Sequence, residues 1–143
     1  MSIEWSSGLS TGVEWQDRQH KELFRRINSL LDAMSIGLGK DEVLKLFRFL
    51  DEYFVVHFEA EEQAMNRYKF PALITHLSEH MDFIERVFVL EKECAEKLTT
   101  STVIKVQRTV VDWLVHHIGT VDQTLGRFIL EAEKDAEAVK EKA

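Results

Sequence analysis

Two pairs of potential metal ligands are spaced so that each pair shares one face of a helix. His57 and Glu61 are four residues apart, as are His76 and His80. Four residues turn an α-helix by about 400°, so the members of each pair stack on one another. The residues that lie three or four positions apart along the same helix face as each pair are mainly apolar, which predicts that both faces are buried. Because a buried carboxylate without a partner is unfavourable, a cation bound inside the protein would stabilise it.

Three further candidates complete the set. His20 begins an apolar row in the first third of the chain, and His117 ends another. Asp122 follows His117 by five residues, about 140° away from its face on a continuous helix. We therefore expect a helix break near Gly119 and a restart at a capping box over residues 120–123. The candidate metal ligands are His20, His57, Glu61, His76, His80, His117 and Asp122.

Four amphipathic segments with short connections must position these side chains. The predicted helices cover residues 15–36, 41–67 and 71–98, and a fourth runs from 102 onward. Apolar residues repeat at helical spacing in each segment, so the fold class is all-α, an antiparallel up-down four-helix bundle. We expect an irregular N-terminal arm over residues 1–14, with Trp5 and Trp15 packed on the body. A charged C-terminal helical extension should cover residues 131–143.

Several residues mark the predicted helix ends. Gly37 and Gly39 should stop the first helix, and Asp41 should cap the second. Pro71 suits the first turn of the third helix. A polar break at residues 99–101 offers cap residues for the fourth.

Composition limits the classes of protein to which the chain can belong. Its 143 residues suit one domain, 1–143, with 45% hydrophobic residues for a core and one proline and six glycines. With 18 basic and 25 acidic residues, the net charge of −7 argues against nucleic acid as a partner. The single cysteine, Cys94, fits a reducing compartment and is expected to be a small buried side chain. The sequence shows no signal peptide and no membrane-spanning run, which predicts a cytoplasmic protein without membrane insertion.

The number and type of ligands point to two metal ions. Seven donors exceed the four that one zinc ion takes. Imidazole and carboxylate together suit iron, copper or zinc, and no thiolate favours a softer metal. Two six-coordinate ions that share both carboxylates and one oxygen atom would use all seven side chains. They would leave one position open, where a small diatomic ligand could bind.

The spacing of the seven candidates resembles that of the hemerythrins, in particular the single-domain bacteriohemerythrins. Asp17-Arg18-Gln19-His20 is similar to the first histidine motif of that family. Glu61-Glu62-Gln63-Ala64-Met65, followed by Tyr68 and Pro71, resembles the second motif, and Trp113-Leu114-Val115-His116-His117-Ile118 resembles the last. The match covers nearly the whole chain.

The resemblance implies a non-haem diiron site, oxo- or hydroxo-bridged, that binds dioxygen reversibly. It implies one iron held by three histidines, a second held by two, and two bridging carboxylates. The three histidines are His76, His80 and His117, and the two are His20 and His57. The bridging carboxylates are Glu61 and Asp122. The residues that match the apolar oxygen pocket of the family are Leu23, Trp113, Leu114 and Ile118.

Three kinds of function remain open at this point. The first is an oxygen carrier, buffer or store, which is a binding protein rather than an enzyme. The second is a diiron oxygen or redox sensor, and the third is an enzyme acting on peroxide or nitric oxide. A reductase or an oxygen-accepting client is a potential partner, and the family resemblance suggests a monomer. His116 should be exposed, whereas Glu62 could contact a metal ligand.

Overall fold

The computed structural model describes residues 3–36 and 40–142, and in these residues all regular structure is helical. The short 3₁₀ turn η1 covers Ser7–Leu9, and η2 and η3 are π-helical turns. The elements in chain order are η1 (Ser7–Leu9), α1 (Glu14–Ser35), α2 (Lys40–Tyr53), η2 (Phe54–Phe58), α3 (Glu59–Arg67), α4 (Leu73–Glu96), α5 (Thr100–His116), η3 (His117–Val121) and α6 (Asp122–Lys142).

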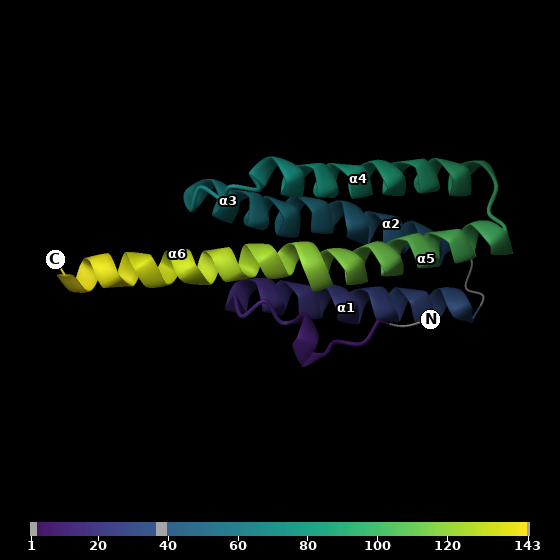
Figure 1. The fold of residues 1–143 in the computed structure, drawn as a ribbon. Helices are drawn as coiled ribbons and strands as arrows, with labels where there is room; N and C mark the ends of the chain where they lie inside the picture. The colour runs from purple at the N-terminus through teal and green to yellow at the C-terminus, as the bar shows by residue number, and fades with distance from the viewer. Residues whose placement is uncertain (1–2, 37–39, 143) are drawn as a thin grey trace.

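These elements form four antiparallel rods (Figure 1). The first rod is α1 and the third is α4, whereas the second joins α2, η2 and α3 and the fourth joins α5, η3 and α6. Successive rods run in opposite directions, so the predicted up-down four-helix bundle is confirmed. Both π-helical turns lie within long rods, where they change the register of the side chains without ending the helix.

The observed helix ends correct some of the predicted ones. Thr99 caps α5, as expected, through a reciprocal capping box with Thr102. Asp41 was expected to be a cap, but α2 already begins at Lys40 and places Asp41 in its first turn. Pro71 lies in a turn before α4, which begins at Leu73. The predicted stop at Gly37 and Gly39 lies outside the described residues.

Two apolar clusters fill the interior at different levels of the bundle. The larger cluster includes Leu23, Phe58 and Phe83, and the smaller includes Met65 and Leu125. Along each rod, the candidate metal ligands lie between residues of the two clusters. The candidate site is therefore a polar layer enclosed by apolar side chains from above and below.

The N-terminal arm packs along α1. The Ile3 N–H donates to Asn28 Oδ1 at 2.7 Å, and Asn28 Nδ2 donates back to the Ile3 carbonyl at 2.6 Å. Trp5 packs against the larger apolar cluster, and Trp15, in the first turn of α1, packs against the smaller one. The predicted packing of both tryptophans on the body is therefore confirmed.

The C-terminal half of α6 extends beyond the other rods (Figure 1). Between residues 131 and 141 every side chain except Ala132 is exposed, which matches the charged, solvated extension predicted there. None of the helices in residues 3–36 and 40–142 combines the length and the apolar character needed to cross a bilayer. Cys94 is buried and free, as expected.

Candidate metal centre

All seven predicted ligands meet inside the bundle, although they come from every rod. None of these side chains is more than 2% exposed. α1 supplies His20, and the second rod supplies His57 and Glu61. The remaining ligands lie on α4, η3 and the start of α6. They are His76, His80, His117 and Asp122.

One oxygen of each carboxylate faces a group of three histidines. Glu61 Oε1 lies 3.1 Å from His76 Nε2 and 3.0 Å from His80 Nε2. Asp122 Oδ1 lies 3.3 Å from His76 Nε2 and 3.2 Å from His117 Nε2. The donor atoms of these five residues all lie within 4.8 Å of one another.

The other oxygen of each carboxylate faces a group of two histidines. Glu61 Oε2 lies 3.0 Å from His57 Nε2 and 3.7 Å from His20 Nε2. Asp122 Oδ2 lies 3.1 Å from His20 Nε2. These four residues form the second group whose donor atoms converge within 4.8 Å. The two carboxylates are thus common to both groups, with one oxygen on each side.

The unsatisfied polar atoms of this layer fit a bound cation. Neither carboxylate oxygen of Asp122 has a hydrogen-bond partner in the described part of the chain, and neither does His117 Nε2. His117 Nε2 and Asp122 Oδ1 approach to 3.2 Å without forming a hydrogen bond. Buried groups of this kind are costly to leave unpaired. A metal ion between them would provide the missing interaction, and nitrogen and oxygen donors suit iron.

A π-helical turn brings Asp122 to the same side as His117. The Asp122 N–H donates to the carbonyl of His117, five residues earlier, instead of the four of an α-helix. Because the turn contains one extra residue, side chains five positions apart face the same side here, as side chains four positions apart do in an α-helix. The predicted break at Gly119 is therefore wrong, because the helix continues through it.

The predicted capping box over residues 120–123 is also wrong. Because the helix does not restart, no free N–H groups need a cap at this point. Thr120 Oγ1 instead donates to the His116 carbonyl at 2.6 Å. Gln123 Nε2 donates to the carbonyls of Leu9 and Ile118, which ties the N-terminal arm to this turn.

The second π-helical turn, η2, contains His57. It joins α2 to α3 without a break, so His57 and Glu61 keep their predicted spacing on one rod. This turn has no signal in the sequence, since its residues are apolar or aromatic like those of any buried helix. Turns of this type are frequent at functional sites in helices.

Most of the histidines are also held by their other ring nitrogen. His57 Nδ1 donates to Gln19 Oε1 at 2.5 Å, and His117 Nδ1 donates to Glu79 Oε1 at 3.1 Å. His80 Nδ1 lies 3.5 Å from Glu62, the acid that we expected to contact a ligand. Such contacts fix the ring orientation and leave Nε2 free to bind a metal ion.

Gln16 is a fourth supporting residue, and it was not among the residues predicted from the sequence. Its side chain is wholly buried, and Nε2 donates to Glu61 Oε2 at 2.8 Å. Gln16 precedes His20 by four residues, so the helical count that found His20 could have found it. Gln19 and Glu79 carried no comparable signal, because their roles depend on contacts between rods.

Aromatic rings pack flat against three of the histidines. The ring centroids of Phe58 and His80 are 3.8 Å apart with an interplanar angle of 2°. Trp113 stacks on His117 at 4.3 Å, and Tyr53 stacks on His57 at 4.7 Å. These contacts limit the rotation of the imidazole rings and keep the layer dry.

The residues matched to the oxygen pocket belong to the larger apolar cluster. Leu114 and Ile118 are fully buried, and Leu23 and Trp113 are 1% and 8% exposed. Leu23 also lines a cavity of about 320 Å³ between α1 and α2 that reaches His57. His116 is exposed, as predicted, although it is the immediate neighbour of His117.

Without metal, the carboxylates keep protons on part of the site. Burial lowers the pKa of His20 and His76, but the neighbouring Asp122 and Glu61 carboxylates raise both to about 9. Burial lowers the pKa of His57 more than Glu61 raises it. Burial would raise the pKa of Glu61 and Asp122, but the histidines around them hold both well below their usual values. Metal binding would replace protons on imidazole nitrogens that lie between two ionised carboxylates.

A four-helix bundle with histidines and carboxylates converging from all rods defines a class of buried metal-binding bundles. Residues 11–129 match the model of the hemerythrin HHE cation binding domain. The chain therefore belongs to the hemerythrin family.

Curated relatives agree with this assignment. The chain is 32% identical over 129 residues to a bacteriohemerythrin of Methylococcus capsulatus, covering 87% of this chain and 94% of the relative. It is 31% identical over 129 residues to a bacteriohemerythrin of Aquifex aeolicus, covering 87% and 95% of the two chains. A myohemerythrin of Theromyzon tessulatum is 27% identical over 119 residues, or 83% and 87% of the two chains.

Proposed function

We propose that this protein binds dioxygen reversibly at two non-haem iron ions and serves as an oxygen carrier, buffer or store. The observation that carries the proposal is the division of the carboxylate oxygens. Oε1 of Glu61 and Oδ1 of Asp122 face three histidines, whereas Oε2 and Oδ2 face two. Two carboxylates shared in this way suit a pair of ions rather than one.

The proposed ligands follow this division. His76, His80 and His117 would hold one iron, and His20 and His57 would hold the other. Glu61 and Asp122 would bridge them. When bound, the iron pair supplies the redox-active centre at which dioxygen binds. The group with two histidines has one donor fewer, so an open position would lie on the side of His20 and His57.

The apolar side chains around the layer would keep water and protons away from this position. Leu114 and Ile118 have no exposed surface, and Leu23 follows His20 by one helical turn. Exclusion of water preserves reversible binding, because protons favour release of reduced oxygen species and leave the metal oxidised. We propose that Leu23, Trp113, Leu114 and Ile118 form this wall.

The donor set favours binding over oxidation chemistry. Five neutral imidazoles and two carboxylates put less negative charge on the metal pair than the four-glutamate sets of oxygen-activating bundles. Less negative charge disfavours highly oxidised iron. We therefore propose a binding protein rather than an enzyme. The single cysteine supports a cytoplasmic location.

An optical experiment tests the proposal. Iron-loaded protein is reduced under argon, exposed to air, and returned to argon, with spectra recorded at each stage and iron measured per chain. The proposal expects about two iron ions per chain and charge-transfer bands that appear in air and disappear under argon. Rapid conversion to a stable oxidised spectrum, or one ion per chain, would contradict it.

A further inference from the structure

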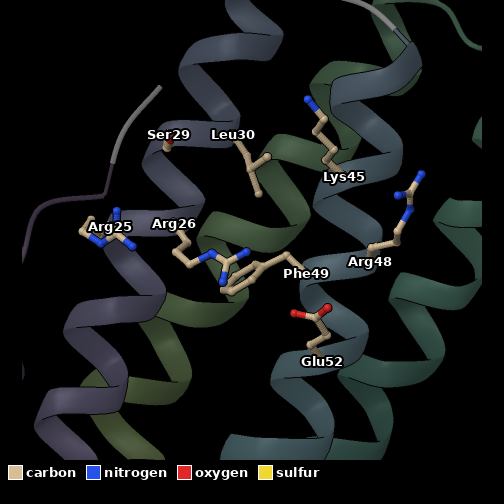
Figure 2. A pocket seen from close by; sticks show the side chains of 8 residues that line it. All are labelled: Arg25, Arg26, Ser29, Leu30, Lys45, Arg48, Phe49 and Glu52. Atoms are coloured by element: carbon tan, nitrogen blue, oxygen red, sulfur yellow. The ribbon is translucent and has the colours of Figure 1, made fainter.

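A basic groove lies between α1 and α2, on the outside of the bundle. It has a volume of about 330 Å³ and is open to solvent. Figure 2 shows its side chains on the two neighbouring helices. Four of the eight residues that line it are cations, and one is acidic. The residues are Arg25, Arg26, Ser29, Leu30, Lys45, Arg48, Phe49 and Glu52.

The cations of this groove are available to a partner. All four are exposed, and neither Arg26 nor Arg48 forms an ion pair within the described residues. Arg25 pairs with Glu22, and both of these side chains are solvent-exposed, so this pair can exchange partners at little cost. Lys45 pairs with Glu42, which is only 14% exposed, but the Lys45 side chain itself is 58% exposed. On a chain of net charge −7, a local group of cations determines where an acidic protein can approach.

A row of aromatic rings leads from the floor of the groove to the candidate metal centre. The guanidinium of Arg26 lies 4.5 Å from the ring centroid of Phe49 (Figure 2). The rings of Phe49 and Tyr53 are 6.4 Å apart, and those of Tyr53 and His57 are stacked at 4.7 Å. His57 Nε2 then lies 3.0 Å from Glu61. Phe49, Tyr53 and His57 also line the adjoining cavity that reaches the centre.

We propose that this groove is the docking site of a small acidic one-electron donor protein, and that Phe49, Tyr53 and His57 form the electron route to the metal pair. The inference rests on the proposed function, since iron that has become oxidised must be reduced before it binds dioxygen again. In each encounter the donor is oxidised by one electron and the iron pair is reduced by one. Two encounters therefore restore the fully reduced pair.

The geometry favours a protein donor over a small anion. The cations are spread over two helices around an open groove rather than directed at one point (Figure 2). Redox partners commonly form small interfaces that are guided by complementary charge. The aromatic route gives such a partner a reason to dock here, because electron transfer falls steeply with distance and packed rings shorten the gaps.

The docking test uses iron-loaded protein and a purified acidic [2Fe–2S] ferredoxin as the probe. The double variant Arg25→Glu, Arg48→Glu is compared with Lys134→Glu, Lys140→Glu, which changes the net charge equally on the exposed end of α6. At low salt, the groove variant should be reduced by the ferredoxin about tenfold more slowly than wild type, whereas the α6 variant should not. The dissociation constant of the groove variant for oxidised ferredoxin should also rise about tenfold.

Two outcomes overturn the docking site. Equal effects of the groove and α6 variants would mean that net charge alone matters. Equal slowing of the groove variant with the methyl viologen radical cation would mean that the slower reduction does not come from lost ferredoxin docking, because a cationic reductant should not be slowed by added carboxylates. A protein that ferredoxin reduces through the groove but that binds dioxygen irreversibly would contradict only the proposed function.

A second pair of variants tests the electron route. Phe49→Leu removes a ring that is 8% exposed, whereas Tyr53→Phe keeps the ring and removes only the hydroxyl. Phe49→Leu should slow reduction by bound ferredoxin without changing the dissociation constant, and Tyr53→Phe should leave both near wild type. Unchanged transfer in Phe49→Leu would exclude this route.

Discussion

Gln16 and Glu61 meet in the sealed interior of the bundle, where Gln16 Nε2 donates to Glu61 Oε2 at 2.8 Å and neither side chain is exposed. The contact restrains a carboxylate that faces four histidines, and it acts on the oxygen nearest His57. Because the amide of Gln16 is neutral, it can donate to this oxygen without neutralising the carboxylate charge that would attract a metal ion.

Replacement of Gln16 by alanine should weaken metal binding without unfolding the protein. Loss of a contact that orients a metal ligand typically reduces affinity by about tenfold or more. Competition with a chelator of known affinity measures the change. Gln63→Ala is the control, because Gln63 is exposed on the same rod as Glu61. Equal affinities for the two variants would show that Gln16 has no role at the centre.

His80→Ala should reduce the iron content below two ions per chain. His80 Nε2 lies 3.0 Å from Glu61 Oε1, and we expect it to be a direct ligand of the three-histidine group. His116→Ala removes an exposed imidazole and should leave the content unchanged. Elemental analysis after gel filtration measures both. Two ions per chain in His80→Ala would remove His80 from the proposed ligand set.

The glycines near the π-helical turn should differ in their tolerance of a methyl group. A Cβ at Gly126 would lie 2.6 Å from Thr11 Cβ and 2.9 Å from the Thr11 carbonyl oxygen, so Gly126→Ala should destabilise the fold by about 1–3 kcal/mol. At Gly119 the nearest atom is Leu9 Cδ2 at 3.5 Å, and alanine there should be neutral or stabilising by up to about 1 kcal/mol. Thermal unfolding of both variants tests the order. A lower melting temperature for Gly119→Ala than for Gly126→Ala would contradict it.

Asp17 should make the stability of the fold depend on pH. Burial raises the pKa of its carboxyl group, but hydrogen bonds from Ser10, Thr11 and Gly12 outweigh this and lower it below the usual value. The folded state therefore binds this proton less readily than the unfolded state. The stabilisation is complete above the unfolded pKa of about 4 and is lost as the pH falls through the lower folded pKa.

Asp17→Asn isolates this contribution. At pH 6, urea unfolding should give a smaller free energy of unfolding for the variant than for wild type. This difference in stability should narrow as the pH falls below about 4. A difference that stays constant over this range would mean that the carboxylate charge of Asp17 does not stabilise the arm.

Helical periodicity was sufficient to predict the bundle and the inward faces of the candidate ligands. His20, His57 and His76 lie on apolar rows at helical spacing, from which their burial follows. The same reasoning indicated that Asp122 must turn inward but gave the wrong cause, because a π-helical turn has no distinct sequence pattern. Gln16 could have been found by the same count.

Contacts between rods could not be predicted in this way. Gln19 reaches His57 from another rod, and Glu79 reaches His117 from another rod. Nothing in the local sequence distinguishes these residues from neighbouring polar residues, since their partners are 38 positions away in the chain. The basic groove was missed for the same reason, because its cations come from two helices whose sequences each contain both charges.

The turn at η3 holds one residue more than a regular α-helix would hold between His117 and Asp122. If the same residues formed a regular α-helix, everything after the turn would be rotated by about 100°. Asp122 would then leave the interior, and the rest of α6 would present a different face to the bundle. Removing one residue of the turn, such as Thr120, would instead allow a regular α-helix in which this aspartate follows His117 by four residues and stays on the same side. The one extra residue of η3 thus sets the register in which both α5 and α6 face the same interior.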